Sequence, residues 1–435
     1  MKQTLLASLL VALSTTVFAD APWPQWRGPD GQGHLSGEGY PATWSETENI
    51  AWKAELPGSG HSSPVIDEQH VWLTTATADP ITEEARKKKL EANTGSQPLT
   101  LVGRLSMRAL CIDRKSGKLL HNIEVLSHDD PQWTHQINTF ASPTPVLSDG
   151  RLYCSFGSHG NACLDTKTLK VLWTNQELEV MHENGPGSTP VVWGDFFIVH
   201  CDGSDAQFIA ALNKHDGKLA WKTKRSGEMN SNPQLQKAYG TPLMVKIQGR
   251  DQLISPAADW LYSYDPATGE ELWKLHYGVL GFSNVPRPVA GKGMIFIATS
   301  FMKSQIQAIK VEDGKPRLVW KYDKAVPRIA SPLLVGDELY FINESGIATC
   351  LDAQTGKLHW DERLGGNVAA SPTYADGHLY FHNREGETYV VKPGPEFNLL
   401  HTNQLDGGHW ASLAGADGEF IVRTDKALYC LRKPK

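Results

Sequence analysis

Residues 351–360 read LDAQTGKLHW: an apolar residue, an Asp, a turn that ends in Thr-Gly-Lys, and then a Trp. The arrangement recurs around the chain, and full or degenerate copies begin at Ile112, Leu164, Leu212, Tyr264, Ile309 and Val391. A further copy is split, with residues 429–431 closing the chain and residues 50–53 lying near its start. Repetition at this spacing indicates an architecture built from identical units.

A second signal alternates with the first and consists of Ser or Thr, Pro and then apolar residues. Arg replaces the hydroxyl residue in the fifth copy and Pro is missing from the eighth; the copies start at Ser63, Thr144, Thr189, Thr241, Arg287, Ser331, Ser371 and Ser412. Most intervals fall between 40 and 52 residues, and the first is longer because it contains an insertion.

Each unit reads as four short strands separated by turns. In residues 367–402 these are NVAASPTYA, HLYFHN, ETYVVKP and FNLLHT, with Gly-containing turns between them. Four strands in about 40–45 residues are typical of a β-propeller blade. We therefore predict an all-β fold, an eight-bladed propeller of four-stranded antiparallel blades. The split copy predicts that the N- and C-terminal strands pair and close the ring, which removes free sheet edges.

The repeated unit, (Ala/Cys)-(Leu/Ile)-Asp-x-x-(Thr/Asp)-Gly-Lys-x-x-Trp, resembles the pyrroloquinoline-quinone (PQQ) type propeller repeat and covers nearly all of the chain after its first residues. Quinoprotein alcohol dehydrogenases and the propeller lipoprotein of the outer-membrane β-barrel assembly machinery (BamB-like) share this repeat. Residues 23–33, WPQWRGPDGQG, resemble the start of secreted PQQ-like repeat proteins. The resemblance implies a fold and leaves the chemistry open.

Residues 1–21 are predicted to be a signal peptide. Lys2 precedes an apolar run at residues 5–13, and small residues allow cleavage after Ala19 or Ala21. No Cys follows either site, so the chain departs from the lipoprotein pattern. We expect an extracytoplasmic protein, periplasmic or secreted and soluble after cleavage.

Residues 22–48 are expected to form an N-terminal strap held by Trp23 and Trp26, and residues 49–435 the propeller. The insertion at about 78–104 is predicted to be helical, with Asp79 as the cap and Pro80 in the first turn. Such a helix suits a lid, a docking element or an exposed charged decoration. No other stretch has the ~18 apolar residues of a membrane helix.

The formal net charge of −6 gives no support for nucleic-acid binding. We expect a monomer whose partner is an unidentified protein, small molecule or glycan.

The cysteines mostly occupy one repeat position, which indicates a small packing slot; they are Cys111, Cys163, Cys350 and Cys430. Cys154 lies opposite Cys163 when two hairpins are aligned, so a disulfide between them is a possibility in an oxidising compartment. No two cysteines are adjacent. The vicinal disulfide that quinoprotein alcohol dehydrogenases place over the quinone is therefore impossible here.

The loops that enter the inner strands converge on one mouth of the channel, and their polar residues are the candidate ligand-binding set. These are His61, Asn138, Asn184, Tyr239, Asn284, Arg287, Arg328, Asn367, His409 and Trp410. They suit either a polar ligand site or a wet channel whose side chains bond to water and loop backbone. The repeated Trp, by contrast, is expected to pack between blades.

Common catalytic and metal motifs are missing. There is no Gly-x-Ser-x-Gly, no Cys-x-x-Cys, and His182-Glu183-Asn184 lacks the second His of a zincin helix. We assign no catalytic residue, metal or cofactor, and PQQ with calcium is not expected because the inner loops lack a carboxylate set.

Three functions remain open. The first is a noncatalytic binding or scaffold propeller. The second is a PQQ-dependent dehydrogenase of alcohols or sugars with a reduced site. The third is recognition of a glycan or peptide in the central funnel.

Overall fold

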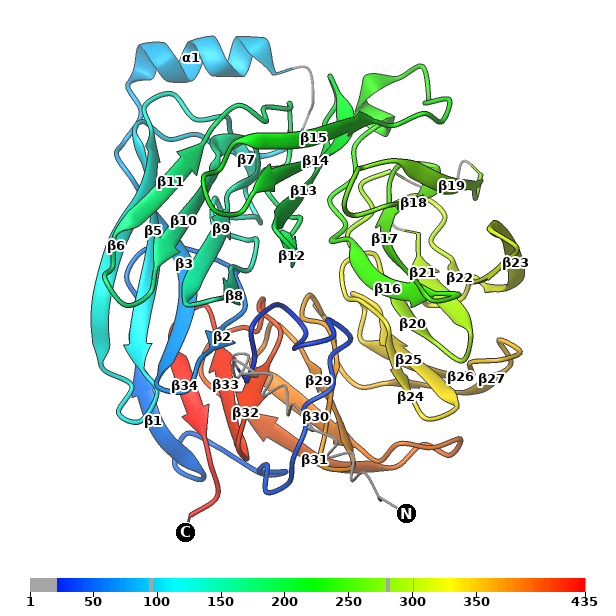
Figure 1. Ribbon diagram of the computed structural model, residues 1–435. Coiled ribbons are helices and arrows are strands. Elements are labelled where there is room, and N and C mark those ends of the chain that lie inside the picture. The colour runs from blue at the N-terminus through cyan, green and yellow to red at the C-terminus, as the bar shows by residue number, and fades with distance from the viewer. Residues whose placement is uncertain (1–21, 94–96, 279–281, 300, 435) are drawn as a thin grey trace, which may run out of the picture.

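The computed structural model describes residues 22–93, 97–278, 282–299 and 301–434. The predicted signal peptide lies outside the described residues. Eight four-stranded antiparallel sheets are arranged around a ring (Figure 1), which confirms the predicted propeller.

Each blade is numbered along the chain and its strands run outward from the channel. Blade 1 contains β2 (Val65–Ile66), β3 (His70–Ala78), β5 (Leu105–Asp113) and β6 (Leu119–His128), and blade 2 contains β8 (Val146–Ser148), β9 (Arg151–Ser155), β10 (Asn161–Asp165) and β11 (Val171–Asn175). Blade 3 contains β12 (Val191–Trp193), β13 (Phe196–Asp202), β14 (Gln207–Asn213) and β15 (Leu219–Lys224), and blade 4 contains β16 (Leu243–Ile247), β17 (Arg250–Pro256), β18 (Trp260–Tyr264) and β19 (Glu271–His276).

Blade 5 contains β20 (Val289–Gly291), β21 (Met294–Ala298), β22 (Ile306–Glu312) and β23 (Lys315–Tyr322), and blade 6 contains β24 (Leu333–Val335), β25 (Glu338–Ile342), β26 (Ile347–Asp352) and β27 (Leu358–Arg363). Blade 7 contains β28 (Thr373–Ala375), β29 (His378–His382), β30 (Glu387–Val391) and β31 (Leu399–Gln404), and blade 8 contains β32 (Ala414–Ala416), β33 (Glu419–Arg423), β34 (Leu428–Leu431) and β1 (Ile50–Ala54). Outside the blades lie a small sheet of β4 (Leu99–Thr100) and β7 (Thr134–His135), α1 (Glu83–Ala92), and two 3-10 turns, η1 (Gly157–His159) and η2 (Pro233–Leu235).

The ring closes through the chain ends, as the split copy predicted. β1 pairs antiparallel with β34, so that Trp52 lies opposite Cys430, and Figure 1 shows the blue strand beside the red one. One blade therefore contains strands from both termini.

The repeated Trp joins neighbouring blades. The indole of Trp173 lies over Gly217 in the next blade, where an added Cβ would meet the ring at 2.6 Å, and its Nε1 donates to Lys214 O at 2.9 Å. Gly217 also has a φ of +73°, so this position requires glycine for two reasons. Equivalent contacts join Trp52 to Gly117, Trp221 to Gly269 and Trp320 to Gly356. The repeat of residues 351–360 is thus an element of blade packing.

The strands are buried on both faces because each blade packs between two others. In β29, Leu379 and Phe381 pack toward blade 6, whereas Tyr380 packs toward blade 8. This explains the loose polar–apolar alternation of the sequence.

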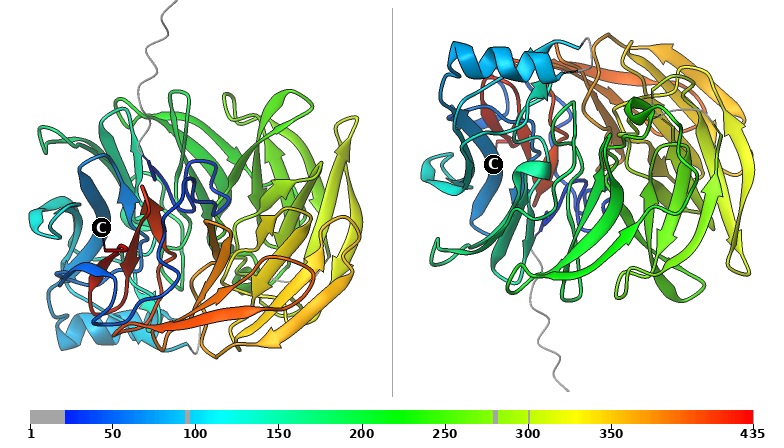
Figure 2. Two further views of the ribbon diagram at one scale, coloured as in Figure 1. Left: turned by 90° about the horizontal axis from the view of Figure 1, so that it is seen from below. Right: turned by 90° about the horizontal axis from the view of Figure 1, so that it is seen from above.

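The helix of the insertion begins later than predicted. Thr82, and not Asp79, is its cap, because the Thr82 hydroxyl accepts from Ala85 N at 3.3 Å while Asp79 N donates to Arg104 O at 2.9 Å. α1 has no buried residue and lies at the edge of the molecule in both views of Figure 2.

The possible disulfide between Cys154 and Cys163 is not formed. All six cysteines are buried and free, and Cys154 pairs across the strands with Ala162 while Cys163 pairs with Tyr153. This offset of one residue turns the two thiols to opposite faces of the blade.

Candidate functional site

The strap, residues 22–48, crosses the middle of the ring in dark blue in Figure 1. Trp23 N donates to Ile66 O at 3.2 Å, and Ile66 N donates to Trp23 O at 2.8 Å, in the inner strand of blade 1. Further along, Gln32 Oε1 accepts from Ala290 N of blade 5 at 2.7 Å. The strap therefore spans the end of the channel at which the inner strands finish, which we call the strap mouth. The other end, where loops enter the inner strands, is the open mouth.

A ring of hydroxyl groups lies between the two mouths. The residue before the Pro position in seven blades accepts a hydrogen bond from the backbone N of the same residue in a neighbouring blade. The donor and acceptor pairs, at 2.9–3.1 Å, are Ser63–Thr144, Thr144–Thr189, Thr189–Thr241, Arg287–Ser331, Ser331–Ser371, Ser371–Ser412 and Ser412–Ser63. The repeated Ser/Thr of the sequence thus ties the blades around the channel.

Arg287 takes the hydroxyl's place in the fifth blade and holds the strap. Its Nη1 donates to Trp26 O at 2.9 Å and its Nε to Pro242 O at 3.2 Å. Arg27 of the strap reaches back, and its Nη2 donates to Pro332 O at 2.7 Å. Burial lowers the pKa of Arg287 to about 10, and burial together with Arg287 lowers that of Arg27 to about 9. The structure therefore places Arg287 toward the strap, away from the other predicted residues.

Four of the predicted residues bind neighbouring loops at the open mouth. Asn138 Nδ2 donates to Asn184 O at 2.8 Å, and Asn184 Nδ2 donates to Tyr239 Oη at 3.2 Å. Tyr239 N then donates to Asn284 O at 2.7 Å, and Asn284 Nδ2 donates to Ala257 O at 2.6 Å. This chain of bonds links the loops that enter blades 2 to 5.

His61 and Trp410 are brought together at the seam of blades 8 and 1. Their rings stack at a centroid distance of 4.4 Å with an interplanar angle of 4°. The guanidinium of Arg384, which the sequence analysis missed, lies 3.7 Å from the Trp410 ring. Burial, with Arg423 and Arg384, lowers the pKa of His61 to about 3, so the stack contains a neutral imidazole and one cation.

A groove of about 530 Å³ opens beside this stack, between the loops of blades 7 and 8. We call it the blade 7–8 groove; its lining residues are Glu46, Arg384, Glu385, Gln404, Leu405, Asp406, Gly407, Gly408, Asp425 and Lys426. Lys426 pairs with Asp406 at 2.6 Å, and Asp425 Oδ1 accepts from Gly408 N at 2.9 Å.

Arg328 and Asn367 lie on exposed loops of blades 6 and 7, whereas His409, the last of the predicted residues, is only 1% exposed in the loop that enters blade 8. The Arg328 guanidinium is 5.6 Å from the ring of Phe301, and Arg328 N donates to Glu344 Oε1 at 2.6 Å. Asn367 donates to Glu385. The predicted residues therefore form several separate groups and not one cluster.

The most exposed large apolar side chains among the described residues also lie at this rim. Met302 is 58% exposed, Ile137 52% and Phe301 50%. Most of the others, including Leu219 and Leu358, lie on outer strands, and Leu90 lies on α1. Met302 also has a φ of +91°, which is unusual for a residue with a side chain of this size.

A buried ion cluster lies beneath the open mouth in blade 3. Arg225 Nε donates to Asp202 Oδ1 at 3.0 Å and Arg225 Nη1 to Tyr264 Oη at 3.1 Å, while His200 Nε2 lies 3.1 Å from Asp202 Oδ2. The side chains of Asp202 and Arg225 have no exposed surface. Although burial opposes ionisation, Arg225 and His200 lower the pKa of Asp202.

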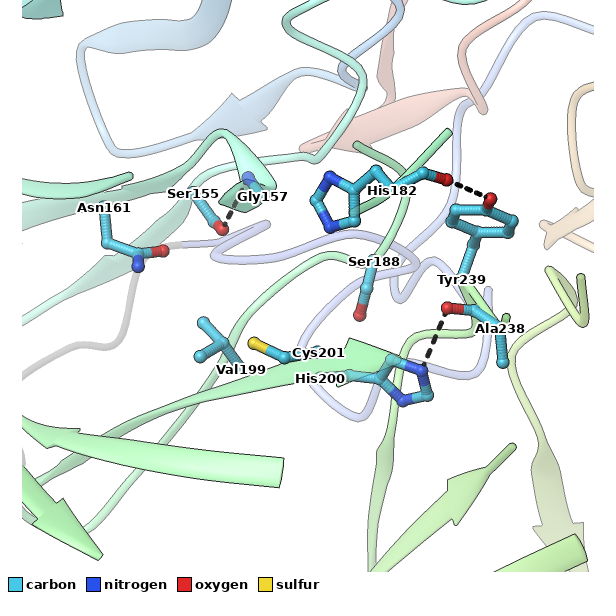
Figure 3. A pocket seen from close by; sticks show the side chains of 11 residues that line it. Ser155, Gly157, Asn161, His182, Ser188, Val199, His200, Cys201, Ala238 and Tyr239 are labelled. Carbon is cyan, nitrogen blue, oxygen red and sulfur yellow. Dashed lines mark hydrogen bonds between the residues drawn. The ribbon is translucent and has the colours of Figure 1, made fainter. Parts of the chain in front are cut away.

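Figure 3 shows the small cavity beside this cluster, between His182, His200 and Tyr239. Tyr239 Oη donates to His182 O at 2.5 Å, and His200 Nε2 lies 3.2 Å from Ala238 O. Its volume of about 10 Å³ accommodates no more than one water molecule, so it is part of the packing of blades 2 to 4.

Several polar side chains outside the predicted set occupy one position that does not repeat, among them His200, His382 and Arg423. A single equivalent position near the end of each second strand differs from blade to blade: Thr74, Ser155, His200, Pro256, Ala298, Ile342, His382 and Arg423. Aligning the second strands in addition to the turns would have shown that this position does not repeat.

Acidification is expected to destabilise the ring through buried neutral histidines. Burial, with smaller effects of His182 and His128, lowers the pKa of His159 to about 3, whereas the unfolded chain titrates near 6.5. The unfolded state takes up the proton first, so stability is lost as pH falls below about 6.5. For His159 alone the loss between pH 7 and pH 5 is about 2 kcal/mol. The free energy of unfolding of His159→Phe, measured with urea, is expected to depend on pH correspondingly less than that of the wild type. The control is His121→Phe, at an exposed site. An unchanged pH dependence in His159→Phe, or the same reduction in the control, would contradict this.

Comparisons with known proteins give the family. The model described as outer membrane protein assembly factor BamB matches residues 93–254, 257–347 and 317–419. The BamB of Shewanella oneidensis is 20% identical over 242 residues, 51% of this chain and 56% of that protein. The quinoprotein ethanol dehydrogenase of Pseudomonas aeruginosa is 30% identical over 143 residues, 29% of this chain and 22% of that enzyme. The chain thus spans less than two thirds of either relative.

Solved structures agree on the fold. BamB from Moraxella catarrhalis superposes with a TM-score of 0.54 at 13% identity, over 77% of this chain and 99% of that one. A europium-containing methanol dehydrogenase gives 0.52 at 10% identity, over 93% and 90%. Within the described ranges no helix has the length and hydropathy needed to cross a bilayer. Since the matched model covers well over half of the chain, this protein belongs to the family of the outer membrane protein assembly factor BamB.

Proposed function

We propose that this chain is an extracytoplasmic, noncatalytic propeller that binds a partner protein at its open mouth and acts as a scaffold. The observation that carries the proposal is the exposure of Ile137, Phe301 and Met302 on the loops of that mouth. Large apolar side chains held in water where loops converge are typical of binding surfaces. The name of the BamB relatives, an assembly factor, supports a role of this kind, and the signal-like residues 1–21 support the location.

The dehydrogenase alternative requires a carboxylate-rich calcium site and an aspartate base. The centre of the ring contains hydroxyl groups and the guanidinium groups of Arg27 and Arg287, each bound to carbonyl oxygens. No three His, Cys, Asp or Glu side chains converge among the described residues. Calcium prefers carboxylate and carbonyl oxygens, and guanidinium groups repel it, so these residues do not fit a calcium-bound quinone.

Glycan recognition has less support than protein binding. Sugars bind aromatic rings through a free face, whereas the Trp410 ring already stacks with His61 and contacts the Arg384 guanidinium. The side chains at the funnel that bond to loop backbone, such as Asn138, are likewise engaged.

Site-specific crosslinking tests the proposal. A photoreactive phenylalanine at position 137 or 301 is expected to give the same partner adduct in the native cell envelope, identified by mass spectrometry. The matched controls are positions 219 and 358, because Leu219 and Leu358 are also exposed, at 47% and 36%, but lie on outer strands. Adducts from the control positions alone, or no adduct from 137 and 301, would overturn it.

The variant Ile137→Ser/Phe301→Ser/Met302→Ser gives an independent measurement. Its unfolding midpoint is expected to be unchanged because the side chains are exposed. The crosslink from a probe elsewhere on the rim, at position 328, is expected to disappear. A persistent adduct would show that the three apolar side chains do not contribute to binding.

A further inference from the structure

Two buried histidines face each other between blades 7 and 8. His382 ends β29, His409 lies in the connection that enters β32, and their ring centroids are 5.2 Å apart. Each residue is only 1% exposed. The pair lies outside the residues that carry the proposed function, and its argument is independent of that function.

Three ring nitrogens of this pair have no hydrogen-bond partner among the described residues: Nε2 of His382 and both nitrogens of His409. The Gly386 backbone lies near His409, but it makes no hydrogen bond of normal geometry with the ring. Buried polar atoms in folded proteins nearly always have a hydrogen-bond partner or a ligand, so three such nitrogens in one place point to a binding site.

The separation of the rings fits a shared metal ion. A Zn–N bond is about 2.0–2.1 Å, which puts each ring centroid about 3.2 Å from the ion; at a tetrahedral angle the two centroids are then about 5.2 Å apart. This equals the observed distance. Imidazole nitrogen is also a ligand that zinc prefers among side-chain donors.

The state and orientation of the rings also suit coordination. Burial lowers the pKa of His409 to about 4 and that of His382 well below its ordinary value, so both rings keep their lone pairs near neutral pH. The Nδ1 of His382 is 2.9 Å from the Thr388 hydroxyl, which leaves Nε2 as the coordinating atom. A second hydrogen bond of this kind commonly orients metal-ligating histidines.

The blade 7–8 groove borders the segment that carries His409. Gly407 and Gly408, which precede His409, line the blade 7–8 groove together with Asp425. Asp425 raises the pKa of His409 and so favours positive charge there. Arg384, on the wall of the same groove, opposes further positive charge near His409, but its guanidinium is directed onto the ring of Trp410.

We propose that His382 and His409 are the two protein ligands of a zinc ion that completes its coordination with water from the blade 7–8 groove. No third His, Cys, Asp or Glu converges with them in the described part of the chain, so the site keeps open positions. No spacing motif reveals it, because the two histidines lie on different blades.

Calorimetric titration of the metal-free full chain with Zn²⁺ tests the site. One equivalent is expected to bind, with at least a tenfold loss of affinity in His382→Gln and in His409→Gln. The control is His401→Gln, an exposed histidine of the same blade, which is expected to bind like the wild type. No saturable binding, retention in both site variants, or equal loss in the control would overturn the proposal.

A measurement on the wild type keeps the test valid if a variant fails to fold. Zinc K-edge absorption of the loaded chain is expected to show two imidazole ligands plus oxygen. A spectrum with no imidazole, or with one, would mean that the orphan nitrogens are satisfied by water and that zinc binds only to the surface.

Discussion

Trp23→Ala is expected to lower the free energy of unfolding by about 3–5 kcal/mol, the range for removing a fully buried aromatic side chain. Trp23 is 1% exposed and packs in the core cluster shared by blades 7, 8 and 1. Its ring also covers Gly28, where a Cβ would lie 2.6 Å from it. Loss of the indole therefore has two effects: it leaves a cavity in the core and it removes the packing that holds the strap. Denaturant unfolding followed by far-ultraviolet circular dichroism measures the effect.

Trp26→Ala is the matched control for this prediction. Trp26 belongs to the same strap, but its ring is only half-buried and makes one hydrogen bond, from Nε1 to Ser412 Oγ at 3.2 Å. We expect a loss of about 1–2 kcal/mol, from the single hydrogen bond and the partly buried ring. If Trp23→Ala cost no more than Trp26→Ala, the strap would not be an integral part of the fold.

Asp202→Asn is expected to destabilise the protein by about 3–5 kcal/mol, because it leaves the charge of Arg225 buried without a counterion. Arg225 keeps its bonds to Tyr264 and Ser255, but neither neutralises it. The double variant Asp202→Leu/Arg225→Met is expected to recover most of this loss, since buried ion pairs contribute little over apolar packing.

The control for the ion cluster is Lys246→Ala, which breaks an exposed pair with Asp251 at 3.6 Å. Its free energy of unfolding should stay within about 0.5 kcal/mol of that of the wild type. Denaturant unfolding of Asp202→Asn, of the double variant and of Lys246→Ala measures these three free energies. A small effect of Asp202→Asn, or no recovery in the double variant, would mean that Arg225 is reached by water.

Periodic features of this chain were predictable from the sequence. The spacing of Ser/Thr-Pro and Trp, and the split copy at the termini, led directly to eight blades and to the pairing of the N- and C-terminal strands. Such positions recur because each blade packs between two similar blades, so the same residue types are favoured at the same place in each unit.

Features that depend on a single residue were less predictable. Arg287 was placed with the mouth residues, but it stands in the hydroxyl ring and binds the strap, because its position follows the Ser/Thr repeat. The alignment that placed Cys154 opposite Cys163 was wrong by one residue, and a shift of one residue moves a side chain to the other face of the sheet. His61 and Trp410 were in the predicted set, whereas Arg384 was missed because the hairpin that positions it is not part of the inner-strand loops.

Titration of the purified chain with PQQ in the presence of calcium, followed by absorbance and calorimetry, tests the central claim most directly. A noncatalytic propeller whose channel holds the strap and two arginines predicts a flat titration and no dye-linked oxidation of alcohols or sugars. Saturable binding of one equivalent together with substrate oxidation would contradict it.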